Sequence, residues 1–194
     1  MLKKLSRTFA VLAAVVTLFI CGQAGIASAN LVTNGGFETG DFTGWTLTNV
    51  DLDNDFVFVA NTGTQHSGDY EALLGKTGSV GTLSQSIATT AGQSYIVSFW
   101  LANDYPGMNL FQALWNGAVQ NPNLASSNAF DYTLYQYQAT AAGSSSEIAF
   151  NFRNDPSTFH MDDVSAVPTP IPAAAYLFGS GLLGLVGIRK KMQN

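Results

Sequence analysis

The sequence predicts an all-β domain at its centre, built as an antiparallel β-sandwich. Short stretches of alternating apolar and polar residues recur at intervals of roughly ten to twenty residues. They are rich in aromatic and β-branched residues, and clusters of Gly, Asn, Asp and Ser separate them, as is typical of strands joined by turns. Two sheets that each bury one face would accommodate them. The expected strands are residues 56–60, 82–88, 95–101, 109–115, 132–140, 146–153 and 159–164.

Side-chain alternation separates a core face from a solvent face in each stretch, because successive residues of a strand point to opposite sides. The expected core residues are Tyr95, Val97, Phe99, Leu101, Tyr135, Tyr137, Ala139, Ile148, Phe150 and Phe152. The alternate positions include Trp100, Asn151 and Arg153. We therefore expect these three residues to share one exposed polar face.

Two segments flank this domain, and the first is a secretory signal peptide with an apolar helix. Residues 1–29 combine a basic start, an uncharged apolar run and the small-residue sequence Ala27-Ser28-Ala29, which signal peptidase accepts. An alternative is a lipoprotein acylated at Cys21, although Ile20 occupies the preceding position, where a small residue is expected. Removal of the signal leaves no cysteine, so no disulfide can stabilise the exported domain.

The second flanking segment, residues 167–194, predicts a transmembrane helix. Residues 171–188 carry no charge, and as a helix they span about 27 Å, close to a hydrocarbon core of ~30 Å. The basic residues Arg189, Lys190 and Lys191 follow and favour the cytoplasmic side of the inner membrane. The domain at residues 30–166 would then lie outside that membrane.

This tail also resembles the PEP-CTERM sorting signal of Gram-negative bacteria, in its VPLPA-type variant. The resemblance rests on Pro170, Ile171 and Pro172 followed by an apolar helix and a basic end, with Ile171 where the family's Pro-Glu-Pro motif has glutamate. It implies that an exosortase, a membrane-embedded cysteine peptidase, cuts near the proline motif. The inner membrane would then be a transient partner, and the domain would reach the cell surface or extracellular matrix. A permanent anchor is the alternative.

The central domain is strongly acidic. All thirteen acidic residues of the chain lie between Glu38 and Asp163, and only Lys76 and Arg153 are basic in residues 30–166, which gives this domain a formal charge of −11. Such a charge makes nucleic acid and anionic lipid poor partners, so we expect no nucleic-acid binding. The carboxylates can instead serve calcium, or simply solubility.

Three parts of the domain resemble carbohydrate-binding modules with a galactose-binding-like jelly roll. Residues 34–45 are similar to the opening strand of those modules, residues 66–73 to a small-residue turn, and residues 161–164 to their last strand. The resemblance implies a jelly-roll sandwich that binds extracellular polysaccharide without catalysis.

The same resemblance implies a structural calcium site where these three parts meet. Glu38 and Asp162 would supply carboxylates, and backbone oxygens near residues 67–69 would complete the shell. Asp163 is the alternative ligand, because alternation sends the two aspartates to opposite faces. The simpler alternative is that Glu38 is a surface acid and that the aspartate pair caps a strand.

Motifs of catalysis are missing from the sequence. It has no Gly-x-Ser-x-Gly elbow, no His-Glu-x-x-His pattern and no cysteine after the signal peptide, so we expect no enzyme. Sugar recognition needs aromatic faces and planar polar groups, and the expected ligand-binding residues are Trp100, Trp115, Asn151 and Arg153. Three functions remain open: an exported glycan-binding protein, a structural or adhesive matrix protein without a glycan ligand, and a polysaccharide hydrolase.

Overall fold

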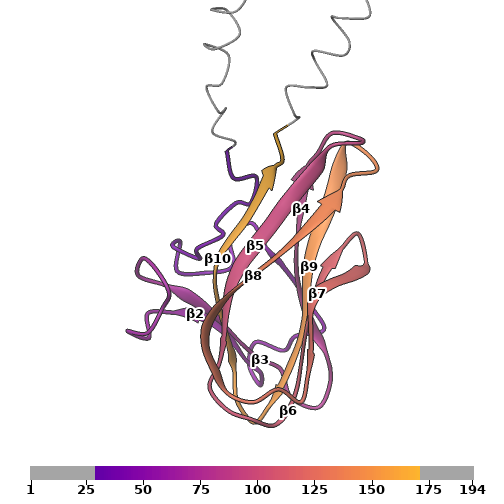
Figure 1. Ribbon diagram of the computed structural model, residues 1–194. Helices are drawn as coiled ribbons and strands as arrows, with labels where there is room; N and C mark the ends of the chain where they lie inside the picture. The colour runs from indigo at the N-terminus through magenta and orange to yellow at the C-terminus, as the bar shows by residue number, and fades with distance from the viewer. Residues whose placement is uncertain (1–28, 171–194) are drawn as a thin grey trace, which may run out of the picture. The chain divides into compact units, whose positions relative to one another are not determined.

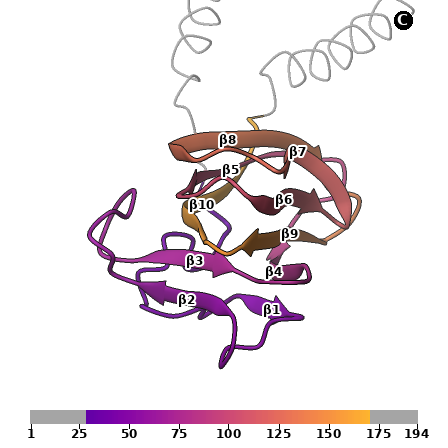
Figure 2. The same ribbon diagram turned by 90° about the horizontal axis from the view of Figure 1, so that it is seen from below.

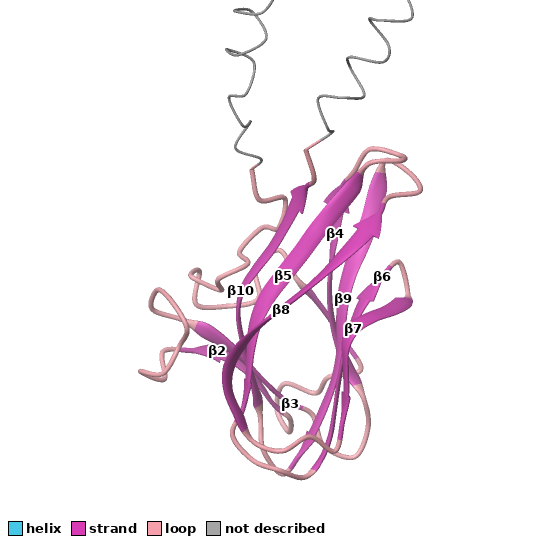
Figure 3. Ribbon diagram, in the orientation of Figure 1, coloured by secondary structure: helices cyan, strands magenta, loops and turns pink. Residues whose placement is uncertain are grey.

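The computed structural model describes residues 29–170, which form a sandwich of two five-stranded antiparallel sheets (Figures 1 and 3). The strands are β1 (Thr46–Thr48), β2 (Phe56–Ala60), β3 (Glu71–Gly75), β4 (Gly81–Ala88), β5 (Ser94–Asn103), β6 (Met108–Trp115), β7 (Ala118–Ala125), β8 (Phe130–Thr140), β9 (Ser145–Asp155) and β10 (Phe159–Pro168). Sheet A has the order β1-β4-β9-β6-β7, and sheet B has the order β2-β3-β10-β5-β8. The predicted fold class is confirmed, and β1, β3 and β7 are additional to the predicted strands.

The predicted terminal segments lie almost entirely outside the described residues. Ala29 and residues 167–170 are the only parts of them that the structure describes, so Pro170 of the proposed sorting motif is described and Ile171 and Pro172 are not. Residues 29–170 contain no helix, and hence none with the length and apolar character to cross a membrane.

The two sheets lie side by side in Figure 2, with β1 and β2 at one edge and β7 and β8 at the other. β9 occupies the centre of sheet A between β4 and β6, and β10 occupies the centre of sheet B between β3 and β5. Both central strands come late in the chain and pair with strands that lie much earlier in the sequence. The topology therefore brings early and late parts of the sequence into contact.

The segment before β1 lies along β10 and closes the sandwich. Leu31 donates its backbone N–H to the carbonyl of Ala166 at 2.9 Å, and Val164 donates to the carbonyl of Gly35 at 2.8 Å. Position 35 requires glycine, because a Cβ there would lie 2.0 Å from the Val164 carbonyl oxygen. This close approach places Glu38, three residues later, near the part of β10 between Asp162 and Ser165, where the strand has a β-bulge.

The core is a cluster of aromatic side chains between the sheets. Phe150 of β9 lies 4.9 Å from Phe99 of β5 between ring centroids, edge to face, and 6.1 Å from Trp45. Trp45 in turn stacks on Phe37 at 5.8 Å. The core faces predicted for β5, β8 and β9 are confirmed, since all of the expected residues are buried or pack against the buried cluster.

Candidate functional site

The loop between β2 and β3, residues 61–70, reaches across the outer face of sheet B. The imidazole of His66 stacks on the indole of Trp100 of β5, with ring centroids 3.8 Å apart and planes at 16°. The same ring meets Tyr132 of β8 edge to face at 5.5 Å. The chain therefore covers part of its own outer face here, and the candidate sites described below all involve this loop.

Glu38 fixes one side of this loop. Its carboxylate accepts backbone N–H bonds from Asp69 at 3.0 Å and from Tyr70 at 3.1 Å. Gly68 adopts φ +62°, and a Cβ there would lie 2.2 Å from Glu38 Oε1. Glycine thus allows both the left-handed turn and the close approach of the carboxylate.

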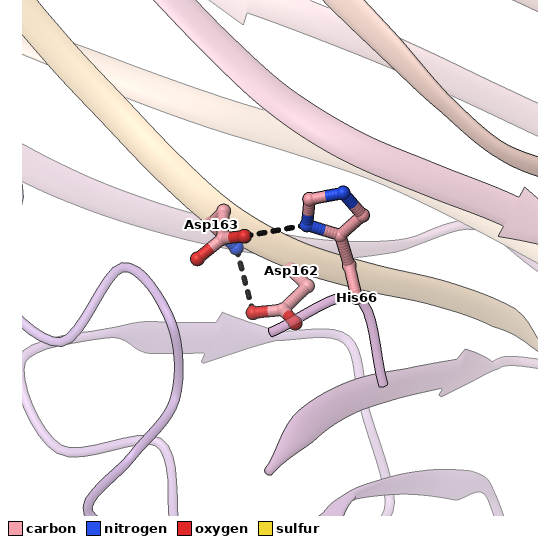
Figure 4. Close-up of side chains that lie close together, drawn as sticks. All are labelled: His66, Asp162 and Asp163. Atoms are coloured by element: carbon pink, nitrogen blue, oxygen red, sulfur yellow. Dashed lines mark hydrogen bonds and ion pairs between the residues drawn. The ribbon is translucent and has the colours of Figure 1, made fainter. Parts of the chain in front are cut away.

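Asp162 and Asp163 hold the other side of the loop (Figure 4). The Asp162 carboxylate accepts N–H bonds from Ser67 at 3.0 Å and from Asp163 at 2.7 Å. Asp163 contacts His66 Nδ1 at 2.7 Å and accepts the Ser67 hydroxyl at 2.8 Å. The expectation that the two aspartates point to opposite faces is therefore wrong. A β-bulge between Asp162 and Ser165, with Asp163 at φ 51°, turns both toward the same loop.

These carboxylates converge with one histidine. His66 and one carboxylate oxygen from each of Asp162 and Asp163 lie within 4.8 Å of one another. A Cβ at Gly36 would lie 3.6–3.7 Å from Asp163 Oδ1, Asp162 Oδ1 and Glu38 Cγ, so all three acids surround that glycine. Burial raises the pKa of Asp162 to about 6. The three sequence parts that resemble carbohydrate-binding modules do meet in space, because Glu38 and Asp162 both accept hydrogen bonds from the loop at residues 61–70.

A second cluster, centred on the fully buried Glu71 at the start of β3, was not predicted. The Glu71 carboxylate accepts hydroxyl bonds from Thr62 and Tyr132 and lies 3.0 Å from His160 Nδ1 of β10. The other ring nitrogen of His160, Nε2, lies 2.8 Å from Asp104 Oδ2. His160 thus bridges a buried carboxylate and an exposed one.

The electrostatics of this cluster favour an ion pair. Burial opposes ionisation of Glu71, but hydrogen bonds from His160, Thr62 and Tyr132 outweigh it and hold the pKa of Glu71 below its usual value. Burial likewise opposes protonation of His160, and the two carboxylates outweigh it and raise the pKa of His160. An imidazolium that donates one N–H to each carboxylate satisfies both of its ring nitrogens.

His160, Asp104 and Tyr132 of this cluster line one wall of a pocket of about 680 Å³, with Glu71 buried behind them. Its lining includes Asn103, Asp104, Phe130, Asp131, Tyr132 and His160, with Thr64 contributed by the covering loop. These residues come from β5, β8, β10 and the loops at their ends. The volume lies within the range of small-ligand sites, which is about 300–1,000 Å³.

The expected ligand-binding tryptophans do not face this pocket. Trp115, at the end of β6, is 5 % exposed and stacks on Tyr95 in the core at 5.9 Å, so the expectation that it contacts a ligand is wrong. It shares the alternation of Phe111, which also faces the core. Trp100 points outward as predicted, but His66 already covers one face of its indole.

Asn151 and Arg153 do not share a face with Trp100, which corrects that expectation. They belong to β9 of sheet A, whereas Trp100 belongs to β5 of sheet B, and the outer faces of the two sheets lie on opposite sides of the sandwich. Asn151 joins a row of polar contacts across sheet A that links Thr82, Gln112 and Asn123. Arg153 pairs with Asp155, with Nε 2.8 Å from Oδ2.

This two-sheet sandwich, bound together by its first and last segments, has the architecture of carbohydrate-binding modules. No protein-family model and no curated protein matches the sequence. The structure is similar to TmCBM61 in complex with β-1,4-galactotriose, with a TM-score of 0.58, 20 % identity and coverage of 73 % of this chain and 100 % of that one.

Two modules described as CBM22 have the same fold. The CBM22-1 xylan-binding domain of Paenibacillus barcinonensis Xyn10C matches with a TM-score of 0.53 and 16 % identity, over 76 % of this chain and 99 % of that one. A Clostridium thermocellum xylanase that carries CBM22-1 and GH10 modules, complexed with xylohexaose, matches with a TM-score of 0.52 and 14 % identity. The match covers 73 % of this chain and 29 % of the xylanase chain. The likeness establishes the fold.

Proposed function

We propose that residues 30–166 are a non-catalytic glycan-binding module of an exported protein, and that the pocket beside His160 receives the glycan. The observation that carries this proposal is the joint presence of aromatic and carboxylate groups in one pocket of a carbohydrate-binding-module fold. The similar structures include one in complex with a galactotriose and one described as xylan-binding. Polysaccharide of the extracellular matrix is therefore the partner class that we propose.

The chemistry of the lining suits sugar hydroxyls. Asp104 and Asp131 expose carboxylates, which accept hydrogen bonds from hydroxyl groups. Phe130 and Tyr132 bring aromatic rings to the same pocket, where they can cover the apolar face of a sugar ring. The ion pair with His160 holds Asp104 in place, so that part of its ordering is complete before the ligand arrives.

A double substitution tests the pocket directly. We expect Asp104→Ala with Asp131→Ala to weaken binding at least about tenfold, because loss of two charged acceptors exceeds 1.4 kcal/mol. Affinity electrophoresis in gels that contain galactan, xylan or native matrix polysaccharide measures the effect. The matched control is Asp53→Ala with Glu147→Ala, which removes the same charge from two exposed residues outside the pocket.

Two outcomes would count against this proposal. If the polysaccharide gels retard the pocket variant and the control variant equally, the glycan binds elsewhere on the surface. No retention of the wild-type protein by any of these polysaccharides favours the structural or adhesive role, for which the polar outer face of sheet A offers an alternative contact surface.

We further propose that the loop at residues 61–70 holds a structural calcium ion. Asp162 and Asp163 supply carboxylate oxygens beside Gly36, and the Glu38 carboxylate lies against Gly68 of the loop. Gln65 Oε1, in the same loop, is buried without a hydrogen-bond partner among residues 29–170. Calcium binds six to eight such oxygens. A bound ion would join the N-terminal segment, the loop and β10, a useful connection in a domain without disulfides.

Export and sorting complete the proposal. We propose that residues 1–29 direct secretion, that an exosortase cuts near Pro170, and that the domain reaches the cell surface or matrix after a membrane-bound intermediate. The expected result is a mature protein that begins at Asn30 and ends before residue 176, which intact mass spectrometry of surface and inner-membrane fractions measures. A surface-exposed protein that is intact through Lys191 would show a permanent anchor instead.

A further inference from the structure

The pocket beside His160 carries uncompensated negative charge. The Asp104 side chain is 62 % exposed and Asp131 is also exposed. The cation in the wall, His160, shares its two N–H groups between Glu71 and Asp104. Glu71, Asp104 and Asp131 carry three negative charges against the one positive charge of protonated His160, which leaves two. The Asp131 carboxylate pairs with no group in residues 29–170.

No lysine or arginine of the described residues is placed to serve an anionic ligand there. Lys76 pairs with Asp55 at 2.8 Å, and Arg153 pairs with Asp155 on the other sheet. Neither lines the pocket. A glycan with uronate or sulfate groups would meet carboxylates of the same sign, both in the pocket and across a domain of formal charge −11, and such contacts are repulsive.

We infer that the glycan for this pocket carries free amino groups, as a polymer of 2-amino-2-deoxyhexose does when it is not fully N-acetylated. This inference rests on the proposed glycan-binding function. An ammonium group offers three donors, and Asp131 and Asp104 supply the matching acceptors. Bonds between two charged groups are about twice as strong as neutral ones. The rings of Tyr132 and Phe130 remain available for the apolar faces of the sugar.

The test measures how the purified full chain binds three hexasaccharides, which are made of glucosamine, of N-acetylglucosamine or of galacturonate. Isothermal titration calorimetry measures each affinity at low and high salt. We expect glucosamine to bind at least about tenfold tighter than the acetylated form at low salt, since each tenfold corresponds to 1.4 kcal/mol. The preference should shrink as salt screens the charges. Galacturonate should bind most weakly.

The variant Asp131→Asn separates the pocket from general attraction to an acidic protein. It should reduce the preference for glucosamine to below about threefold, whereas Asp53→Asn, which removes an exposed charge outside the pocket, should keep the wild-type ratio. Equal affinity for the free and acetylated forms, or tighter binding of galacturonate, would overturn the inference and leave pocket binding intact. The same loss in both variants would also overturn it. Failure of all three sugars and of neutral polysaccharides would overturn the proposed function itself.

Discussion

Replacement of Glu71 by Ala should destabilise the domain by about 3–5 kcal/mol, the range observed when one partner of a buried ion pair is removed. Glu71 is 0 % exposed and accepts bonds from Thr62, Tyr132 and His160. The substitution leaves His160 protonated beside an apolar gap or forces it to lose its proton. It also leaves two hydroxyl groups without their acceptor. Urea denaturation monitored by tryptophan fluorescence measures the loss.

The pH dependence of this loss follows from the two pKa shifts. The pKa of Glu71 is held below its ordinary 4.5, so its contribution is complete above that value and falls as the solution is acidified. The pKa of His160 is raised above its ordinary 6.5, so its contribution is complete below that value and falls as the pH rises through the raised pKa. The difference between wild type and Glu71→Gln should therefore be largest between pH 4.5 and 6.5.

Two further measurements separate this pair from a general packing defect. Because His66 and His160 are the two histidines of the chain, proton NMR can follow each ring, and Glu71→Gln should lower the pKa of His160. The exposed Glu147 of β9 is the matched control, and Glu147→Ala should change the stability by no more than about 0.5 kcal/mol. A loss below 1 kcal/mol in Glu71→Ala, or one independent of pH in Glu71→Gln, would contradict the assignment.

Alternation in the sequence predicted which side chains face the core, because the period of a strand is a local property. Ile148, Phe150 and Phe152 follow that rule, as does Phe99. The same rule applied to Phe111 would have placed Trp115 in the core, so that signal was present in the sequence. Local periodicity distinguishes the inner face of a strand from its outer face and gives no further information.

Which outward-facing residues lie on the same sheet could not be predicted from alternation. Trp100 and Asn151 both point outward, yet strand order assigns them to different sheets. Strand order depends on pairings between distant segments, such as Asp162 with Trp100, which no local pattern specifies. The shared face expected for Trp100, Asn151 and Arg153 failed for that reason.

The Glu71 cluster escaped prediction for a related reason. Glu71 occupies an outward position of β3 and would ordinarily face water, but the loop that carries Thr62 covers it. His160 is likewise an outward residue of β10 that Glu71 and Asp104 enclose. Burial here comes from a loop folded over the sheet, and alternation contains no information about such a cover. The apolar Leu73, also outward and only 7 % exposed, was the one local sign.

If the proposed site is present, calcium should stabilise the protein by about 2.7 kcal/mol at one hundred times the dissociation constant, because an ion held there would bind the folded state selectively. The physical reason lies in Asp162, a fully buried carboxylate whose donors among residues 29–170 are the backbone N–H groups of Ser67 and Asp163. A buried carboxylate without a cationic partner is costly, and a divalent ion would compensate it. Thermal unfolding with 1 mM calcium against excess chelator, at fixed ionic strength, measures the gain.

Glu38→Gln is the informative variant for this site. Its amide oxygen can still accept an N–H bond from the loop, so the fold of the loop should persist, whereas the charge that attracts calcium is lost. We expect most of the calcium-induced stabilisation to disappear in Glu38→Gln and to persist in Glu147→Gln. Stabilisation by zinc but not by calcium would mean that His66, with Asp162 and Asp163, selects a metal that accepts nitrogen ligands. No stabilisation by either ion would contradict the calcium site and leave hydrogen bonds and the His66–Asp163 contact to connect Glu38, the loop and β10.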